Sequence, residues 1–229
     1  HRVRLEGLQP GGKYFYRVCA QEILHYAAYS KVLGDTQVTD FYSFQLPEEG
    51  QEDSTALIFN DLHRNPETIK LMSELAGSIP HDFVLFNGDC IPDPASREDA
   101  MYMLHRLTSA FHAEEIPAIF VRGNHEIRNF HSAALPSLLD QPGGKTYGAF
   151  SWGDTRFVVL DCGEDKPDDH PVYYGLNDFS AFRRQQYDFL QEEMDSREFR
   201  RAERRVLVSH IPLWGNGDKY RPCSELWAP

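Results

Sequence analysis

Four groups of polar residues with the chemistry of metal ligands each follow a short apolar run. They are Asp61 with His63, Asp89, Asn124 with His125, and His210. This mixture of carboxylate, imidazole and amide oxygen suits borderline or hard divalent metals such as Mn, Fe or Zn. Two such ions about 3.5 to 4 Å apart clamp a phosphoryl group and lower the pKa of a shared water until it is hydroxide near neutral pH. On an extended chain, Asp61 and His63 would leave the same face and could hold one ion together.

The spacing of these groups is typical of alternating strands and helices. Asp61 and Asp89 are 28 residues apart, and Asp89 and Asn124 are 35 apart, each about the length of one strand–helix–strand unit. Helical periodicity over residues 66–76 and 97–115 predicts the two helices. Right-handed crossovers place the strand ends on one edge of one sheet, and ligands bind at that carboxyl edge. We therefore expect the three groups to converge there.

A second block of elements must deliver His210. Residues 147–152 and 155–161 predict a β-hairpin, so the sheet system is mixed. A long helix is expected over 178–199 because its apolar residues recur with helical spacing. The apolar run 205–209 predicts a strand that ends directly before His210.

The N-terminal part predicts β-structure. Residues 1–8 and 13–20 alternate between apolar and polar side chains on either side of turn residues, and 38–46 predict a last strand. The segment Leu8–Tyr14 resembles the tyrosine corner of immunoglobulin-like and fibronectin type III sandwiches. Such a sandwich needs about seven strands in ~100 residues. We expect residues 1–47 to be part of a fibronectin type III-like sandwich that begins before the sequence; a short β-appendage on the next domain is the alternative.

The charged, apolar-poor residues 48–54 predict a linker. Beyond it, short apolar runs alternate with longer amphipathic segments, which is typical of α/β layers around a buried sheet. The predicted organisation is a partial all-β sandwich over 1–47, the linker over 48–54, and one α/β catalytic domain over 55–229.

Composition narrows the classes of partner. The chain has 229 residues, of which 41% are hydrophobic, enough for a sizeable core. A formal net charge of −12 disfavours nucleic acid, because binding to the phosphate backbone rests on clustered Lys and Arg. The four cysteines lack C-x-x-C spacing, so neither a zinc ribbon nor a redox pair is indicated. No apolar run reaches the roughly 20 residues of a membrane span, and no targeting leader is expected. The sequence assigns no oligomeric state.

The motifs Asp61-x-His63, Gly88-Asp89, Gly123–Glu126 and Val208–His210 stand in the order and approximate spacing of the calcineurin-like metallophosphoesterase superfamily. The chain resembles that superfamily over about residues 55 to 215. The resemblance implies a mixed-sheet αββα-type sandwich that hydrolyses a small phosphate ester. The β-rich stretch ahead of it is similar to the fibronectin-like domain of purple acid phosphatases, which suggests an exported, periplasmic or cell-envelope protein.

The resemblance also implies a role for each motif residue. It implies two divalent metal ions, Mn, Fe or Zn, bridged by Asp89, with Asp61 and His63 on the first and Asn124 and His210 on the second. His125 would not be a ligand: a metal-bridging hydroxide would attack phosphorus, and His125 would stabilise or protonate the leaving oxygen. Glu126 would orient a neighbouring group.

The sequence departs from the family pattern in two places. Purple acid phosphatases normally lack a histidine at the position of His63 and have an iron-binding tyrosine soon after Asp89, where this chain has Pro92 and Asp93. A ferric tyrosinate site is therefore not expected. The superfamily also completes both metal shells with a late Gly-His-x-His segment, and no histidine follows His210. We expect that segment to lie beyond the sequence; substitution by another group or water, or a weakened site, are the alternatives.

Two other classes of function stay open. The fold without competent metals would be a catalytically weakened or inactive binding or scaffold protein. A two-metal hydrolase of a non-phosphate ester is the third class, because only the family resemblance favours phosphorus.

Three charged residues beside these motifs have less specific interpretations. Asp161, at another strand end, is expected to support the fold. Arg64 and Arg128 could contact a phosphate, but solvated side chains are the favoured interpretation.

Overall fold

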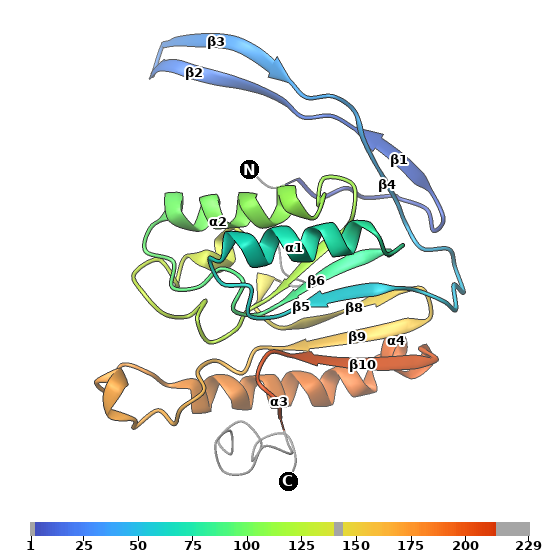
Figure 1. Ribbon diagram of the computed structural model, residues 1–229, viewed down its shortest axis with the longest axis vertical. Helices are drawn as coiled ribbons and strands as arrows, with labels where there is room; N and C mark the ends of the chain where they lie inside the picture. The colour runs from blue at the N-terminus through green and yellow to red at the C-terminus, as the bar shows by residue number, and fades with distance from the viewer. Residues whose placement is uncertain (1–2, 140–143, 214–229) are drawn as a thin grey trace.

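Two β-sheets pack face to face between two helical layers in the computed structural model (Figure 1). It describes residues 3–139 and 144–213. The first sheet holds three parallel strands in chain order, β5 (Ala56–Phe59), β6 (Phe83–Asn87) and β7 (Ala118–Val121). The crossovers between them are α1 (Pro66–Gly77) and α2 (Arg97–Ala110), which cover the outer face of this sheet.

The second sheet is mixed, as predicted. The hairpin β8 (Gly148–Trp152) and β9 (Thr155–Leu160) is antiparallel, and β10 (Arg204–Ser209) pairs with β9 in parallel. Its outer face is covered by α3 (Phe179–Asp195) and α4 (Arg197–Arg201). The predicted αββα arrangement is therefore present in the described residues.

Alternating side chains of the central strands join the layers. On β6, Phe83 and Leu85 pack between the two sheets, whereas Val84 and Phe86 pack against α1 and α2. All of β6 is buried, because both faces of the strand are covered. Each large apolar side chain buried in this way contributes about 1.5–3 kcal/mol relative to exposure.

Capping residues fix where the helices begin and end. Asn65 accepts from the backbone N–H groups of Glu67 and Thr68, and so starts α1 directly after the loop that carries Asp61 and His63. Two expected helices were too long. The one expected over 97–115 ends at Ala110, and the one over 178–199 is broken at Ser196, whose side chain caps the separate helix α4.

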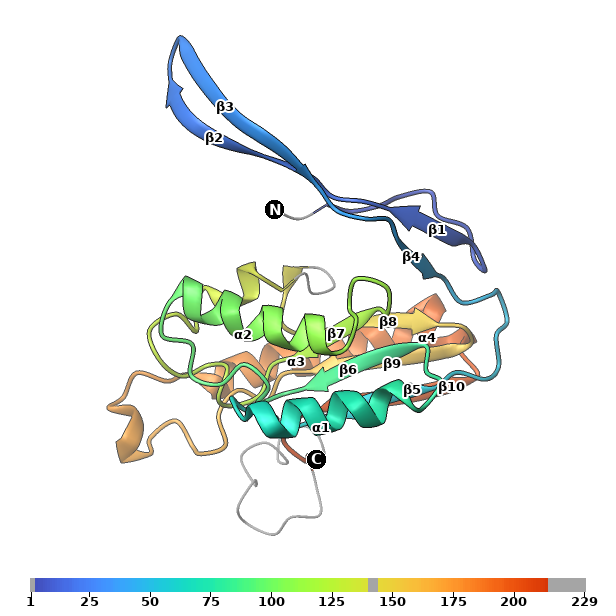
Figure 2. The same ribbon diagram turned by 45° about the horizontal axis from the view of Figure 1, so that its top comes forward.

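The N-terminal strands form two separate pairs, of which one contacts the α/β layers: Tyr16 bonds to the carbonyl of Glu114, and the Ser43 N–H bonds to Glu115 (Figure 2). β1 (Lys13–Tyr16) pairs with β4 (Tyr42–Gln45), and β2 (Cys19–Ala27) pairs with β3 (Ser30–Val38) in a hairpin that projects away from the α/β layers. The Tyr14 hydroxyl accepts from the Gln9 N–H at 2.6 Å, the upstream bond that a tyrosine corner requires.

Three strand predictions in this region were wrong, wholly or in part. The strand expected over 13–20 is divided, because β1 ends at Tyr16 and β2 begins at Cys19. Residues 3–8 form no strand, and residues 1–2 lie outside the described residues. The strand expected over 38–46 is divided, because β3 ends at Val38 and β4 begins at Tyr42. A fibronectin type III-like sandwich and the domain boundaries remain predictions.

Within residues 3–139 and 144–213, no helix has the length and apolar character to cross a membrane.

Candidate metal centre

Backbone hydrogen bonds join the three loops at the carboxyl edge of the first sheet. The loop after β5 bonds to the loop after β6 through Asp61 N–H to Gly88 O at 3.1 Å and His63 N–H to Asp89 O at 2.9 Å. The loop after β6 bonds to the loop after β7 through Asp93 N–H to the carbonyl of His125 at 2.9 Å. The predicted convergence of three strand ends on one edge is confirmed.

The backbone at the first motif differs from the expectation. Asp61 and His63 are not on an extended chain: both lie in the left-handed region, with φ of 53° and 48°, and Asp89 has φ 54°. This conformation costs an L-residue roughly 1–2 kcal/mol. Such strain persists where surrounding contacts fix it, and it gathers at functional sites. The side chains of Asp61 and His63 approach each other through these turns and not through strand alternation.

The two motif glycines make room for the site. A Cβ on Gly88 would lie 2.4 Å from Cγ of His210, and a Cβ on Gly123 would lie 2.3 Å from Oδ1 of Asp89. Gly88 also has a φ of 88°, which residues other than glycine rarely adopt. The glycine in each motif is therefore required by a close contact with a neighbouring functional side chain.

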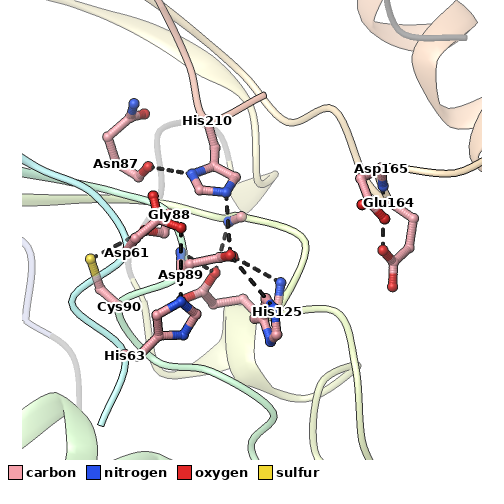
Figure 3. Close-up of polar contacts among 12 residues, drawn as sticks. Asp61, His63, Asn87, Gly88, Asp89, Cys90, His125, Glu164, Asp165 and His210 are labelled. Atoms are coloured by element: carbon pink, nitrogen blue, oxygen red, sulfur yellow. Dashed lines mark hydrogen bonds and ion pairs between the residues drawn. The ribbon is translucent and has the colours of Figure 1, made fainter. Parts of the chain in front are cut away.

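Asp89 is the centre of the cluster (Figure 3). Asp61, His63 and Asp89 each offer one ligand atom, and these atoms all lie within 4.8 Å of one another. On the other side, Oδ2 of Asp89 is 3.4 Å from Nε2 of His210 and 3.9 Å from Nε2 of His125. Asp89 is buried and lies close to Asp61 and His63 on one side and to His210 on the other, so its carboxylate can bridge the two sides.

His210 directly follows β10 of the second sheet and is held with its Nδ1 protonated. Its Nδ1 lies 2.8 Å from the backbone carbonyl of Asn87 (Figure 3). A carbonyl only accepts, so Nδ1 carries the proton and Nε2 faces Asp89. A metal-ligating histidine usually makes this kind of bond through its other nitrogen.

Burial disfavours the charged form of both Asp89 and His210, but their mutual contact outweighs it. The hydrogen bond and charge of Asp89 raise the pKa of His210 to about 9. The hydrogen bond from His210, with those from the His125 backbone, lowers the pKa of Asp89. Without a cation the two therefore form an ion pair at neutral pH, and a bound cation would replace the His210 proton.

Glu126 fixes the loops around Asn124. Its buried carboxylate accepts three backbone N–H bonds, from Asp89 at 2.8 Å, Ile91 at 2.6 Å and Gly123 at 2.8 Å. Burial raises the pKa of this carboxyl. Asn124 is itself buried, at 9% exposure, between Gly123 and a His125 whose N–H is bonded to Asp89. Glu126 therefore orients the backbone amides of Asp89, Ile91 and Gly123 and not a neighbouring side chain.

His125 has two side-chain partners that sequence reasoning missed. Its Nδ1 lies 3.1 Å from Oδ2 of Asp93, and its Nε2 lies 3.0 Å from Nη1 of Arg128. The ring stands nearly perpendicular to that of His63, with centroids 5.0 Å apart. Asp93 orients the imidazole through this contact. The sequence had indicated only that this region lacks the iron-binding tyrosine of purple acid phosphatases.

An ion pair ties the two sheets together behind the site. Arg122, at the end of β7, donates to Asp161, at the end of β9, at 2.6 Å. Asp161 is fully buried, and its backbone exchanges two hydrogen bonds with the side chain of Gln186 from α3. The structural role expected for Asp161 is confirmed, and Arg122 is its partner.

Comparison with known proteins gives a family from the sequence and a similar fold from a solved structure. The family described as Calcineurin-like phosphoesterase matches residues 32–228. Serine/threonine-protein phosphatase CPPED1 of Mus musculus is 26% identical over 138 residues, which cover 59% of this chain and 41% of that protein. The purple acid phosphatase PPD1 from yellow lupin (Lupinus luteus) seeds superposes with a TM-score of 0.66 at 16% identity, over 97% of this chain and 43% of that chain.

The lupin likeness, at that identity, shows the fold. This chain spans about two-fifths of the length of each of these relatives. The family match covers most of the chain and all four motifs, and the α/β layers bring those motifs to one edge. The chain belongs to the calcineurin-like phosphoesterase family.

Proposed function

We propose that this chain carries the catalytic site of a binuclear metal-dependent phosphoesterase that acts on a small phosphate ester. The observation that carries the proposal is the cluster of Asp61, His63 and Asp89, whose ligand atoms lie within 4.8 Å of one another, with His210 on the far side of Asp89. Both relatives are named as phosphatases, which supports hydrolysis of a phosphate ester over hydrolysis of another ester.

The donor atoms fit divalent cations. One carboxylate, of Asp61, and two imidazoles, of His63 and His210, lie within reach of the buried carboxylate of Asp89, a set suited to Mn, Fe or Zn. Asp61 and His63 would hold one ion, Asn124 and His210 the other, and Asp89 both. When bound, such ions supply Lewis acidity at the phosphoryl oxygens and lower the pKa of a water.

His125 is placed to assist the leaving group. Asp93 accepts from Nδ1, so the proton of that nitrogen is held and Nε2 faces the cluster, 3.9 Å from Oδ2 of Asp89. Because Nε2 accepts from Arg128 in this structure, His125 would donate a proton to an oxygen that leaves phosphorus beside Asp89 only as an imidazolium, with both ring nitrogens protonated. The backbone N–H of His125 donates to Oδ1 of Asp89, which keeps the two residues at a fixed separation.

The test is metal analysis of the purified chain together with hydrolysis of an aryl phosphate. The proposal expects about two equivalents of Mn, Fe or Zn per chain after loading, and turnover that chelation abolishes and metal restores. A chain that binds no metal and hydrolyses no phosphate would contradict it and favour a scaffold. Metal binding with turnover of carboxylic esters alone would favour the non-phosphate hydrolase.

A further inference from the structure

Arg128 lies at the edge of the metal centre with its guanidinium aimed at His125. Nη1 of Arg128 is 3.0 Å from Nε2 of His125. The opposite edge of the guanidinium is saturated: Nε and Nη2 donate to the two carboxylate oxygens of Glu164 at 2.7 and 2.8 Å, and Nη2 is 3.4 Å from Oδ1 of Asp165. The side chain is therefore not the solvated arginine that the sequence favoured.

The group that holds Arg128 is itself fixed. Glu164 is 3% exposed, and its backbone carbonyl accepts from the buried guanidinium of Arg183 at 2.6 Å. The neighbouring Asp165 is paired with Lys166. Because this support lies in the loop after β9 and Arg128 lies in the loop after β7, the cation is held in place before any ligand arrives.

The direction of Arg128 indicates an anion as its natural partner. A guanidinium only donates, so in this structure Nε2 of His125 accepts from it. The same donor would lie beside any phosphate oxygen that reaches between His125 and Asp89, and an Arg–phosphate bond is stronger than one to a neutral imidazole. A donor ordered in advance also avoids the entropy cost of recruiting a free side chain.

Arg64 provides the contrast within the same chain. It too pairs with a carboxylate, through two 2.8 Å bonds to Asp99, but its remaining contacts are the backbone carbonyls of Pro92 and Asp93. Its side chain is 48% exposed, against 30% for Arg128. Of the two arginines beside the motifs, only Arg128 faces His125.

We infer that Arg128 binds a terminal oxygen of the substrate's phosphate through Nη1, and that it favours phosphomonoesters over diesters. This inference rests on the proposed function and adds the substrate class. A monoester carries a third terminal oxygen and a second negative charge that a diester lacks, so it gains more from a positioned cation. Glu164 acts through Arg128 as a positioning residue.

The experiment compares Arg128→Gln with Arg64→Gln in the Mn-loaded full chain. We expect Arg128→Gln to weaken the binding of inorganic phosphate, measured by calorimetry, by roughly 10- to 100-fold. The KM for 4-nitrophenyl phosphate should rise by a similar factor, while the KM for bis(4-nitrophenyl) phosphate changes less than about threefold. Metal content should stay unchanged, Arg64→Gln should shift no constant by more than about twofold, and Arg128→Lys should recover part of the phosphate affinity.

A second variant guards against misfolding, because Arg128→Gln leaves a buried carboxylate without its partner. The double variant Arg128→Gln/Glu164→Gln removes both charges and should show the same loss of phosphate affinity. Unchanged phosphate affinity in these variants, or wild-type chain that binds no phosphate, would overturn the inference. Phosphate binding that depends on Arg128, without turnover of any ester, would refute the proposed function and leave Arg128 as a phosphate-binding residue. Turnover with an unchanged KM in Arg128→Gln would support the proposed function and overturn the inference about Arg128.

Discussion

The β2–β3 hairpin and the loops of the metal centre differ in a way that secondary structure alone would not suggest. Every residue of β2 is exposed, and its large apolar side chains Ile23, Leu24 and Tyr26 lie in solvent. The site loops have no regular structure, yet Asp89, Asn124 and Glu126 are among the buried polar residues. A two-stranded ribbon is marginally stable by itself. Burial and satisfied hydrogen bonds, and not strand geometry, therefore decide which region holds its shape.

The largest effect is expected at the centre of the ordered region. Asp89→Ala removes the oxygens that link the Asp61–His63 side to His210. Metal content by elemental analysis should fall to background, and turnover should fall by at least about 10⁴-fold. Asp195→Ala, at a side chain 90% exposed on α3, is the matched control and should change neither quantity. Full activity in the Asp89 variant would refute the site assignment.

His125→Gln separates chemistry from metal binding in the same loops. Turnover of an aryl phosphate should drop by roughly 10²- to 10⁴-fold because the group beside the leaving oxygen is lost. Metal content should remain near that of the wild type, since His125 is not assigned as a ligand. Metal loss in proportion to activity would instead make His125 part of the metal shell.

Hydrogen exchange tests the comparison directly. The amides of Asp89, Ile91 and Gly123 donate to buried Glu126 and should exchange roughly 100-fold more slowly than those of Ile23 and Leu33 in the hairpin. Glu126→Gln should erase most of this difference, because it loses one charged acceptor, at a cost of about 1–3 kcal/mol. Slower exchange in the hairpin than in the site loops would show that the contrast is wrong.

The smallest effect is expected at Asp168, which lies in the long loop that also carries Glu164 and bonds to the first amides of α3. Its carboxylate accepts from the backbone of Phe179 and Ser180. Burial opposes ionisation, but the bonds from Ser180 and Phe179 outweigh it and lower the pKa of Asp168. A lowered carboxyl pKa gives stability that is present above the unfolded value and is lost as pH falls through the folded one.

Asp168→Asn should therefore cost about 1 kcal/mol in urea unfolding at pH 7. The difference from the wild type should shrink as the pH falls below about 3.9, the ordinary value for aspartate. A difference that stayed constant down to acid pH would mean that the carboxylate charge contributes nothing to the start of α3.

The sequence was sufficient for features that depend on local pattern and was not for features that depend on contacts between loops. Periodicity predicted the two α/β layers, and strand–helix–strand spacing predicted that the loops carrying Asp61, Asp89 and His125 meet. The left-handed turns at Asp61 and His63 were missed, because backbone there is set by bonds to the next loop. The break at Ser196 was missed because the helical spacing of apolar residues continues from α3 into α4, although Ser196 ends one helix and caps the next.

The partners of His125 were beyond sequence reasoning for the same reason. Asp93 and Arg128 lie in different loops, and Glu164, which holds Arg128, lies in a third loop, after β9. A signal was present for Asp93, an extra carboxylate soon after Asp89, but nothing in its spacing showed that it faces an imidazole.

The contact between Gly88 and His210 joins the residue that follows β6 of the first sheet to the residue that follows β10 of the second. With only a hydrogen at position 88, the imidazole rests against main chain, so the missing side chain sets how closely the two sheets approach at this edge. Enlarging this centre for a bulkier cation would therefore require moving whole layers apart, and exchanging one ligand for another would leave its width unchanged.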